Sequence, residues 1–407
     1  MSIKKKIITL PAQMRIITKT VWILSLVSLF TDMASEMLYP VMPLFLKSIG
    51  YTALFIGILE GVAEAIAGLT KSYFGKRSDA LGKRLPFVQL GYGLSAISKP
   101  MLALFSFWWW IFISRTTDRL GKGIRTGARD AMLSDECLPG TRGRVFGFHR
   151  SMDTLGAVLG PALALIYLYY YPENYRTLFI IAFIPGLLSI ACTLILKEKK
   201  IIPSTRKEIT TTGIFSFTSY WKSSPVSYKK LSAGLLLFAL INSSDVFLLL
   251  KMKETGHDDT VIIAVYIFYN LVYALLSYPM GMLADRIGLK YIMLGGLLVF
   301  SIVYTGFALS NSLLAFFLLF ALYGLYAAAT EGISKAWISS LVPAGETASA
   351  LGTFSGFQSI CTLFASSFCG LLWFKFGAVA ALLISAAVAL IVIFYISLMV
   401  KKDNTNL

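Results

Sequence analysis

The sequence is poor in charged residues, cysteine and histidine, and these shortages exclude several classes of protein. Only 14% of the 407 residues are charged, whereas a soluble domain carries about a quarter. The four cysteines have neither metal-ligand nor redox spacing, so we expect free thiols used in packing. The histidines His149 and His257 lie far apart, and no glycine-rich phosphate loop with a lysine follows a strand-like segment. We therefore expect no metal centre, no cofactor, no ATP site and no enzyme.

Long apolar segments occupy most of the chain. The sequence is 57% hydrophobic, and segments of about 20 apolar residues are long enough to cross a bilayer core of about 30 Å. Barrel strands would be about ten residues long and would alternate, so helix is the expected conformation. The sequence predicts an all-α membrane protein with twelve transmembrane helices. They are expected at 20–46, 53–73, 85–105, 107–131, 145–170, 175–196, 232–253, 259–282, 289–310, 312–340, 349–373 and 377–399.

Two similar basic turns indicate an internal repeat. Gly75–Arg84 reads GKRSDALGKR and Gly281–Lys290 reads GMLADRIGLK, and their aspartates lie about half the chain apart. Repeated halves that enclose a central site are typical of secondary transporters. We expect an amino-terminal six-helix bundle at 1–196, a polar cytoplasmic linker on the membrane surface at 197–230 and a carboxyl-terminal six-helix bundle at 231–407.

Lysine and arginine concentrate on one side of the predicted membrane. They cluster before the first span and after the second, fourth, sixth, eighth and last spans, whereas the other loops hold few. This bias places both termini in the cytoplasm, so the net charge of +16 indicates topology rather than nucleic-acid binding. The first apolar segment is too long for a cleaved signal peptide and contains Asp32 and Glu36. We expect a monomeric, multi-pass protein of the inner (cytoplasmic) membrane.

The six-plus-six arrangement with a glycine–aspartate turn after spans two and eight resembles the major facilitator superfamily. The second turn is close to the family's loop motif, whereas the first has Ala80 where the family usually has arginine. The resemblance implies that this loop latches the two bundles in the outward-facing state, with its aspartate capping a helix end. Alternatively, the turn needs only glycine for its conformation and aspartate as an N-cap. The gating candidates in the two turns are Asp79, Arg84, Asp285 and Arg286.

Span five contains a pattern of glycines that ends in Gly160 and Pro161. Together with Gly147 and Gly156, it resembles the first part of the superfamily's antiporter signature, but the trailing glycine pair is absent. The resemblance implies export by exchange. Gly156 and Gly160 share one helix face, and such a face also serves as a simple packing groove next to a bend at proline. Gly156, Gly160 and Pro161 are further gating candidates.

Charged residues within the predicted spans are the candidates for coupling and binding. Each costs roughly 2.5–3.5 kcal/mol at the centre of a membrane helix, so they are expected to face a cavity. Span one holds Asp32 and Glu36 and span two holds Glu60 and Glu64, each pair four residues apart. Span four holds a cationic stripe, comprising Arg115, Arg119, Lys122, Arg125 and Arg129, together with Asp118.

The fourth-span residues Arg119, Lys122 and Gly123 resemble a superfamily motif in which the arginine is implied in proton coupling. A carboxylate in a cavity of low dielectric constant also suits a proton carrier. The predicted coupling residues are Asp32, Glu36, Glu64 and Arg119. The alternative is that these charges only neutralise one another across the bundle.

The carboxyl-terminal half is less charged and is expected to shape the site. The predicted substrate-binding residues are Arg115, Arg119, Lys122, Asn242, Asp245, Tyr269, Asn270 and Glu331. Pro40 and Pro43 are expected to break or kink the outer end of span one. The favoured function is proton-coupled transport of a small anionic organic solute by alternating access. The alternatives are efflux of a drug-like lipophilic cation by proton antiport and import of a polycarboxylate ferric siderophore.

Overall fold

The computed structural model describes residues 16–39, 41–51, 53–198, 217–257 and 259–399. Within these ranges, the side chains at 43, 44, 47, 53–58, 60, 61, 64, 65, 217, 218, 259, 260 and 263 lie outside the described part. Every regular element in the part of the chain that the structure describes is helical. The predicted all-α fold is therefore confirmed.

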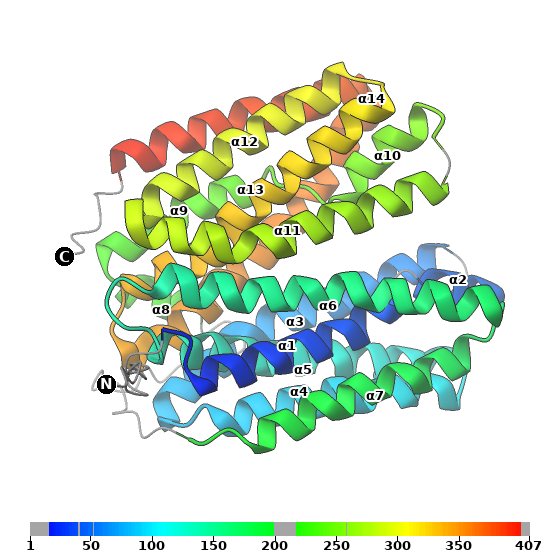
Figure 1. Ribbon diagram of the computed structural model, residues 1–407, viewed down its shortest axis with the longest axis horizontal. Coiled ribbons are helices and arrows are strands. Elements are labelled where there is room, and N and C mark those ends of the chain that lie inside the picture. The colour runs from blue at the N-terminus through cyan, green and yellow to red at the C-terminus, as the bar shows by residue number, and fades with distance from the viewer. Residues whose placement is uncertain (1–15, 40, 52, 199–216, 258, 400–407) are drawn as a thin grey trace, which may run out of the picture.

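The helices form two bundles that lie side by side (Figure 1). The amino-terminal bundle contains α1 (Lys19–Leu38), α2 (Met42–Ser48), α3 (Ala53–Leu81), α4 (Leu85–Leu104), α5 (Trp108–Asp135), α6 (Arg142–Tyr170) and α7 (Tyr175–Leu194). The carboxyl-terminal bundle contains α9 (Val226–Ala239), α10 (Val246–Glu254), α11 (Asp259–Ile287), α12 (Leu289–Leu309), α13 (Leu313–Ser340) and α14 (Thr347–Met399). A short helix, α8 (Phe217–Ser223), precedes the second bundle.

The twelve expected spans correspond to these helices, with three differences in detail. The first span ends at Leu38, and the short α2 follows, so the expected break at its outer end is present. The seventh span is not one helix, because residues 240–245 separate α9 from α10. The eleventh and twelfth spans are both part of α14. The helix is kinked at Gly377, whose φ of 83° lies in the left-handed region that favours glycine. By length and composition alone, seven of the described helices could cross a membrane.

We call the end of the bundles that holds the turns at Gly82 and Gly288 the basic end. The first helix, α1, begins there and α14 ends there (Figure 1). The charge bias predicts that this end faces the cytoplasm. The boundaries of the linker at 197–230 stay a prediction, because residues 199–216 lie outside the described part.

The described end of the linker packs on the second bundle. Tyr220 in α8 is buried, and its hydroxyl donates to the carboxylate of Glu346 at 3.3 Å. The ring of Trp221 contacts Phe357 of α14 edge-on, with 5.5 Å between ring centroids. These two aromatics therefore contact protein, and the position of the linker on the membrane surface stays a prediction.

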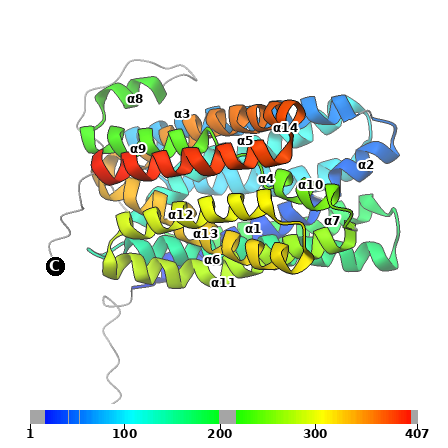
Figure 2. The same cartoon turned by 90° about the horizontal axis from the view of Figure 1, so that it is seen from above.

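The bundles meet along two helix pairs. Figure 2 shows α3 beside α14 on one side and α6 beside α11 on the other. Glycines at the basic end bring the backbones into contact, as they do in many membrane helix pairs. A Cβ atom at Gly281 of α11 would lie 2.2 Å from the carbonyl oxygen of Gly143 in α6. A Cβ atom at Gly75 of α3 would lie 2.4 Å from the carbonyl oxygen of Ala348 in α14.

The predicted glycine face of span five packs within the first bundle. Cβ atoms at Gly156 and Gly160 would lie 2.4 Å from the carbonyl oxygen of Leu29 and 2.5 Å from that of Met33, both in α1. The packing-groove interpretation is therefore confirmed for these two residues. Helix α6 continues through Pro161 without interruption. A gating role for the three residues stays a prediction.

Candidate functional site

The second loop motif joins the two bundles at the basic end. The carboxylate of Asp285, near the end of α11, accepts hydrogen bonds from the backbone N–H groups of Gly143 at 2.7 Å and Arg144 at 3.0 Å. Both donors belong to the first turn of α6, whose N–H groups have no partner within that helix. The guanidinium of Arg144 also pairs with Asp285 at 3.2 Å. Asp285 therefore caps a helix of the opposite bundle, where a negative charge is favoured.

The first loop motif makes the equivalent contact through a different arginine. The carboxylate of Asp79 accepts a hydrogen bond at 2.7 Å from the backbone N–H of Ser349, in the first turn of α14. Arg84 lies 3.5 Å from Asp79, pairs with Asp135 at 2.9 Å and donates to the carbonyl oxygen of Ala344 at 2.8 Å. Arg84 thus supplies a guanidinium to the motif that has Ala80 in place of the usual arginine.

The gating candidates therefore differ in their surroundings. Asp79, Arg84 and Asp285 lie in contacts between the bundles. Arg286 is exposed, and none of the hydrogen bonds or ion pairs described for this structure involves it. The loop-motif residue Arg286 is thus not brought to the interface by the structure.

Replacement of Asp285 by Asn is expected to shift the conformational equilibrium without changing the central site. Asn keeps the size of the side chain but loses the charge that faces the α6 N-terminus and Arg144. We expect a cysteine placed in the cavity to react faster with a thiol reagent added from the basic end. The exposed neighbour Arg286, changed to Gln, serves as the control. Unaltered labelling in Asp285→Asn would contradict a latch.

The residues of the cationic stripe on α5 differ in their exposure to solvent. Arg119 and Lys122 are partly exposed, whereas Arg115, Arg125 and Arg129 are buried. All five residues lie on one face of the helix, so contacts with neighbouring helices, and not the helix period, bury three of them. Only Arg119 and Lys122 of the stripe therefore remain accessible to a ligand from this side.

The buried members of the stripe have protein partners. Arg125 donates to the hydroxyl of Ser95 at 2.6 Å and lies 4.5 Å from the ring centroid of Tyr92. Arg129 pairs with Asp130 at 2.8 Å. Charges this deep are stable only when they are paired or hydrogen-bonded. Arg129 is therefore neutralised by an acid, whereas Arg125 is held by an uncharged hydroxyl and an aromatic ring.

The third span contributes a base that the sequence analysis did not consider. Lys99 in α4 pairs with Asp118 of α5 at 2.8 Å and donates to the hydroxyl of Ser35 in α1 at 3.1 Å. Arg115 interacts electrostatically with the same aspartate. Asp118 and Arg115 thus belong to a buried ion-pair group rather than to the accessible face.

Two carboxyl groups from different helices meet in the first bundle. Asp32 in α1 interacts electrostatically with Asp153 in α6. Asp153 accepts a hydrogen bond from Ser28 and pairs with Arg150 at 2.8 Å. Two neighbouring carboxylates repel each other when both are ionised, so one of them is favoured to bind a proton. The pair is therefore a place where the protein can hold one proton.

Bases from α5 and α4 lie near Glu36, the one from α4 being Lys99. Glu36, one turn after Asp32, interacts electrostatically with Lys122 and Arg119 and also with Asp153. Lys122 interacts with Asp32 as well. The structure thus brings together three of the four predicted coupling residues, Asp32, Glu36 and Arg119. The side chain of the fourth, Glu64, lies outside the described residues, as does that of Glu60.

The second bundle presents a carboxylate and tyrosines. The hydroxyl of Tyr323 in α13 donates to Asp245 at 2.6 Å. Tyr266 in α11 interacts electrostatically with Glu36 of the first bundle and with Asp245 of the second. Two predicted ligand residues, Tyr269 and Asn270, are buried, and the amide of Asn270 donates to the carbonyl oxygen of Tyr266. Asn270 therefore packs within the bundle, whereas Tyr269 also interacts electrostatically with Asp245.

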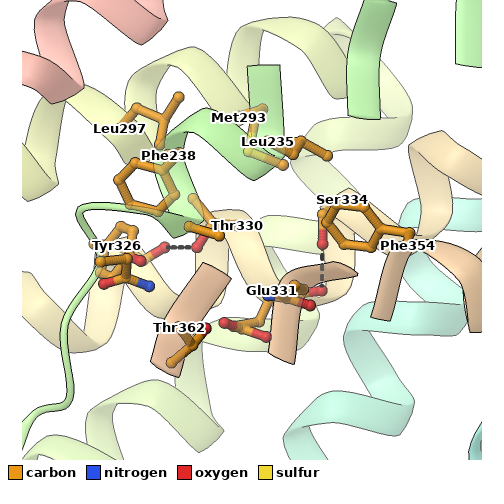
Figure 3. A pocket seen from close by; sticks show the side chains of 13 residues that line it. Leu235, Phe238, Met293, Leu297, Tyr326, Thr330, Glu331, Ser334, Phe354 and Thr362 are labelled. Carbon is orange, nitrogen blue, oxygen red and sulfur yellow. Dashed lines mark hydrogen bonds between the residues drawn. The ribbon is translucent and has the colours of Figure 1, made fainter. Parts of the chain in front are cut away.

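A small pocket extends from this face. Asn242 and Glu331 line it, together with Leu235, Phe238, Ala239, Met293, Leu297, Tyr326, Thr330, Ser334, Phe354, Gln358 and Thr362. Figure 3 shows Leu235, Phe238, Met293 and Leu297 on one side, with Glu331 and Thr362 on the other. The pocket is thus apolar on one wall and polar on the opposite wall.

Charged contacts across the interface lie between the central site and the basic end. Arg150 of α6 donates to the hydroxyl of Tyr273 in α11 and lies 5.1 Å from the centroid of its ring. Lys335 of α13 pairs with Asp130 of α5 at 2.9 Å. Arg150 therefore contacts both Asp153 and the opposite bundle.

Four charged residues of the site were not predicted from the sequence, namely Lys99, Asp130, Arg150 and Asp153. Each lies within an expected span or at its end, so the rule that selected Asp32 and Arg119 also applies to them. The sequence signal was present, but partners on other helices are visible only in the structure.

Comparison with known proteins places the chain in a family. The model of the Major Facilitator Superfamily matches residues 24–253 and again 235–406. An uncharacterised MFS-type transporter of Methanocaldococcus jannaschii is 36% identical over 382 residues, which are 91% of this chain and 94% of the relative. The multidrug resistance protein MdtH of Cronobacter sakazakii is 29% identical over 116 residues, which are 28% of this chain and 29% of that protein.

Solved structures have the same fold over nearly the whole chain. The human organic anion transporter MFSD10 superposes with a TM-score of 0.75 at 17% identity, covering 95% of this chain and 99% of that chain. The proton:xylose symporter XylE superposes with a TM-score of 0.73 at 16% identity, covering 95% and 96%. These likenesses confirm the fold of two six-helix bundles. The chain belongs to the major facilitator superfamily.

Proposed function

We propose that this protein is a proton-coupled secondary transporter of a small organic solute that carries an anionic group. As a superfamily member, it is a multi-pass membrane transporter of a small molecule and not an enzyme. The observation that carries the finer proposal is the group formed by Asp32, Glu36, Arg119 and Lys122. It combines carboxyl groups that can hold a proton with partly exposed bases that can hold an anion.

The proton site in this proposal is the neighbouring pair of Asp32 and Asp153. Two ionised carboxylates in contact repel each other, so the pair favours one bound proton. Loss of that proton makes both groups anionic and strengthens the attraction of Asp153 for Arg150. Because Arg150 also bonds Tyr273 of the opposite bundle, the protonation state is linked to an inter-bundle contact. This link is how proton binding would bias one conformation over the other.

In this proposal, Arg119 and Lys122 of the protein bind the anionic group of the substrate. Both are partly exposed, and both interact with Glu36, which partly neutralises them in the absence of substrate. Protonation of Glu36 would leave the bases available for an anion. Substrate and proton binding are then coupled through one set of charges, and such coupling is reciprocal.

Contacts at the basic end support alternating access. Asp79 and Asp285 each cap a helix of the opposite bundle, and glycine pairs bring the same helices into backbone contact. A rocking motion must break both sets of contacts to open this end. The cytoplasmic position of the basic end, and hence an outward-facing arrangement, belongs to the proposal and rests on the charge bias.

The test is a ligand-stabilisation screen of the purified protein near pH 5.5 and pH 7.5. Organic anions, ferric chelates, lipophilic cations and neutral sugars are compared, because a ligand at about 100 times its Kd stabilises by about 2.7 kcal/mol. We expect anions to stabilise the wild type and to lose at least about tenfold in affinity in Arg119→Ala, since a charge-assisted hydrogen bond contributes about 1.5–3 kcal/mol. Arg286→Ala removes an exposed arginine and is the matched control.

Three results would change the proposal. Stabilisation by lipophilic cations alone would move the binding role to the carboxylates and favour drug efflux. Anion binding that is equal in wild type and Arg119→Ala would make Arg119 a structural ion-pair member. Stabilisation by ferric polycarboxylates alone would narrow the substrate to siderophores.

A further inference from the structure

The break in the seventh span places Asp245 beside the central site. Helix α9 ends at Ala239 and α10 begins at Val246, and Asp245 is the last residue of the unwound segment. Its side chain is half-buried. Substrate and ion sites in repeated-half transporters commonly lie where a spanning helix is discontinuous. The position of Asp245 is therefore one in which a side chain can meet a ligand.

Tyrosines surround the carboxylate of Asp245. It accepts a hydrogen bond from the hydroxyl of Tyr323 and interacts electrostatically with Tyr269. The rings of these two residues lie 5.0 Å apart between centroids, and Tyr326 lies 5.3 Å from Tyr323. The faces of aromatic rings attract cations by electrostatics, and the attraction is stronger where water is excluded. Carboxylate and rings together form an environment that favours a positive charge.

No base neutralises this carboxylate within the part of the chain that the structure describes. None of the described ion pairs involves Asp245, and its charged neighbour among the main electrostatic interactions is another acid, Glu331. The nearby base Lys335 pairs with Asp130 of the first bundle instead. A half-buried carboxylate in this setting is stabilised by a cation that comes with the ligand.

The two faces of the site are complementary in charge. The first bundle presents Arg119 and Lys122 next to Glu36, and the second presents Asp245 and Glu331. Tyr266 interacts electrostatically with both Glu36 and Asp245, so the two faces border the same central region. A ligand that touches both faces would therefore meet bases at one end and a carboxylate at the other.

We propose that Asp245 and its tyrosines form a subsite for an ammonium group, so that the substrate is zwitterionic. Its carboxylate lies at Arg119 and Lys122, and its ammonium group lies at Asp245 with Tyr269 and Tyr323. This inference rests on the proposed transport function and specifies the substrate class of the same site. A zwitterionic substrate differs from a purely anionic one because it also carries the positive group that Asp245 binds.

The experiment compares three charge forms of the same compounds. Phenylalanine, leucine and glutamine are each tested as the free amino acid, as the N-acetyl derivative and as the methyl ester. The first has both charges, the second only the negative charge and the third only the positive charge. Affinity is measured near neutral pH by ligand-induced stabilisation of the purified full-length protein and by competition in proteoliposomes.

At least one free amino acid is expected to bind wild type at least about tenfold more tightly than its N-acetyl derivative, since a desolvated cation–π contact and an ion pair each contribute on the order of a factor of ten. In Asp245→Asn this ratio should fall to about one, because Asn keeps the hydrogen bond from Tyr323 and loses only the charge. Glu254→Gln removes an exposed acid outside the site, which accepts a hydrogen bond from Trp373, and should retain the preference for the amine.

Three outcomes would overturn the inference. Equal or tighter binding of the N-acetyl derivatives to wild type would remove the ammonium subsite, while the proposed transport of an anion would stand. Binding of the esters alone would overturn both the zwitterionic substrate and the anionic one. Absence of any Asp245-dependent binding across the series would also reject the subsite, and organic anions from the broader screen would then test the transport proposal by themselves.

Discussion

Replacement of Asp32 by Asn is expected to abolish pH-driven transport while leaving the protein folded. Asn retains the size of the side chain, so the packing between α1 and α6 is kept. It removes the carboxyl group that lies near Asp153 and can take up the proton in the proposed mechanism. In the variant, Asp153 keeps its pairing with Arg150 and its hydrogen bond from Ser28, and it loses the interaction with Asp32 that favours protonation.

The expected effect can be measured as a gradient-driven accumulation ratio in proteoliposomes. A pH difference of one unit supplies about 1.4 kcal/mol per coupled proton, which supports about tenfold accumulation of substrate. In Asp32→Asn and in Asp153→Asn this ratio should fall to about one, whereas exchange of labelled for unlabelled substrate should continue. Glu254→Gln, which removes an acid that accepts from Trp373 far from the pair, should behave as wild type.

Several other titratable groups surround Asp32 and Asp153. The charged groups that face this pair are Glu36 on α1, Lys122 and Arg129 on α5, and His149 and Arg150 on α6, with Tyr273 on α11. Loss of coupling in Glu36→Gln with normal coupling in Asp32→Asn would place the transported proton on Glu36. Normal coupling in Asp32→Asn, Asp153→Asn and Glu36→Gln together would remove all three carboxyl groups from the mechanism.

The fold followed from the sequence because the signal for a membrane span is simple. Long apolar segments predicted the helices, and the repeated turns at Asp79 and Asp285 predicted two similar halves. The break in the seventh span could not be predicted in the same way. Residues 240–245 read LINSSD, with no glycine or proline to mark an interruption. The helix ends there because of how the segment packs in the bundle, and packing is not visible in one sequence.

The site was only partly predictable, because pairing depends on several helices at once. Arg119, Lys122, Asp32 and Glu36 were identified from charge within a span, and the structure brings them together. The stripe suggested one continuous basic face, but Arg125 and Arg129 have partners within the protein. In the first loop motif, Ala80 suggested a weakened contact, whereas Arg84 reaches Asp79, Asp135 and Ala344 from four residues further along. Sequence spacing cannot show which arginine reaches an interface.

Gly281→Val and Gly160→Val are expected to have different consequences, although both glycines lie in tight contacts of α6. Gly281 lies where α11 of one bundle touches α6 of the other, and Gly160 lies where α6 touches α1 within one bundle. In both cases the new Cβ would meet backbone atoms, at 2.2 Å from the oxygen of Gly143 and 2.5 Å from the oxygen of Met33. Backbone cannot yield as a flexible side chain does, so the helices must separate.

The two contacts differ in whether a second arrangement is available. If alternating access separates the bundles at the basic end, Gly281→Val disfavours only the closed arrangement. Strain of about 1–3 kcal/mol would then shift the ratio of open to closed states by about 5- to 150-fold. In Gly160→Val the strained contact lies within one bundle, where no alternative packing relieves it. That variant should lose a similar free energy in unfolding stability instead.

Labelling kinetics separate these expectations. The four free cysteines Cys137, Cys192, Cys361 and Cys369 are replaced by serine, and Ser334 at the central pocket is changed to cysteine. In Gly281→Val we expect at least about fivefold faster labelling from the basic end with little change in thermal stability. In Gly160→Val we expect a lower melting temperature with unchanged labelling below it. Slow labelling together with a lowered melting temperature in Gly281→Val would show instead that the contact between α6 and α11 is a permanent part of the fold, and the basic end would then not be the gate.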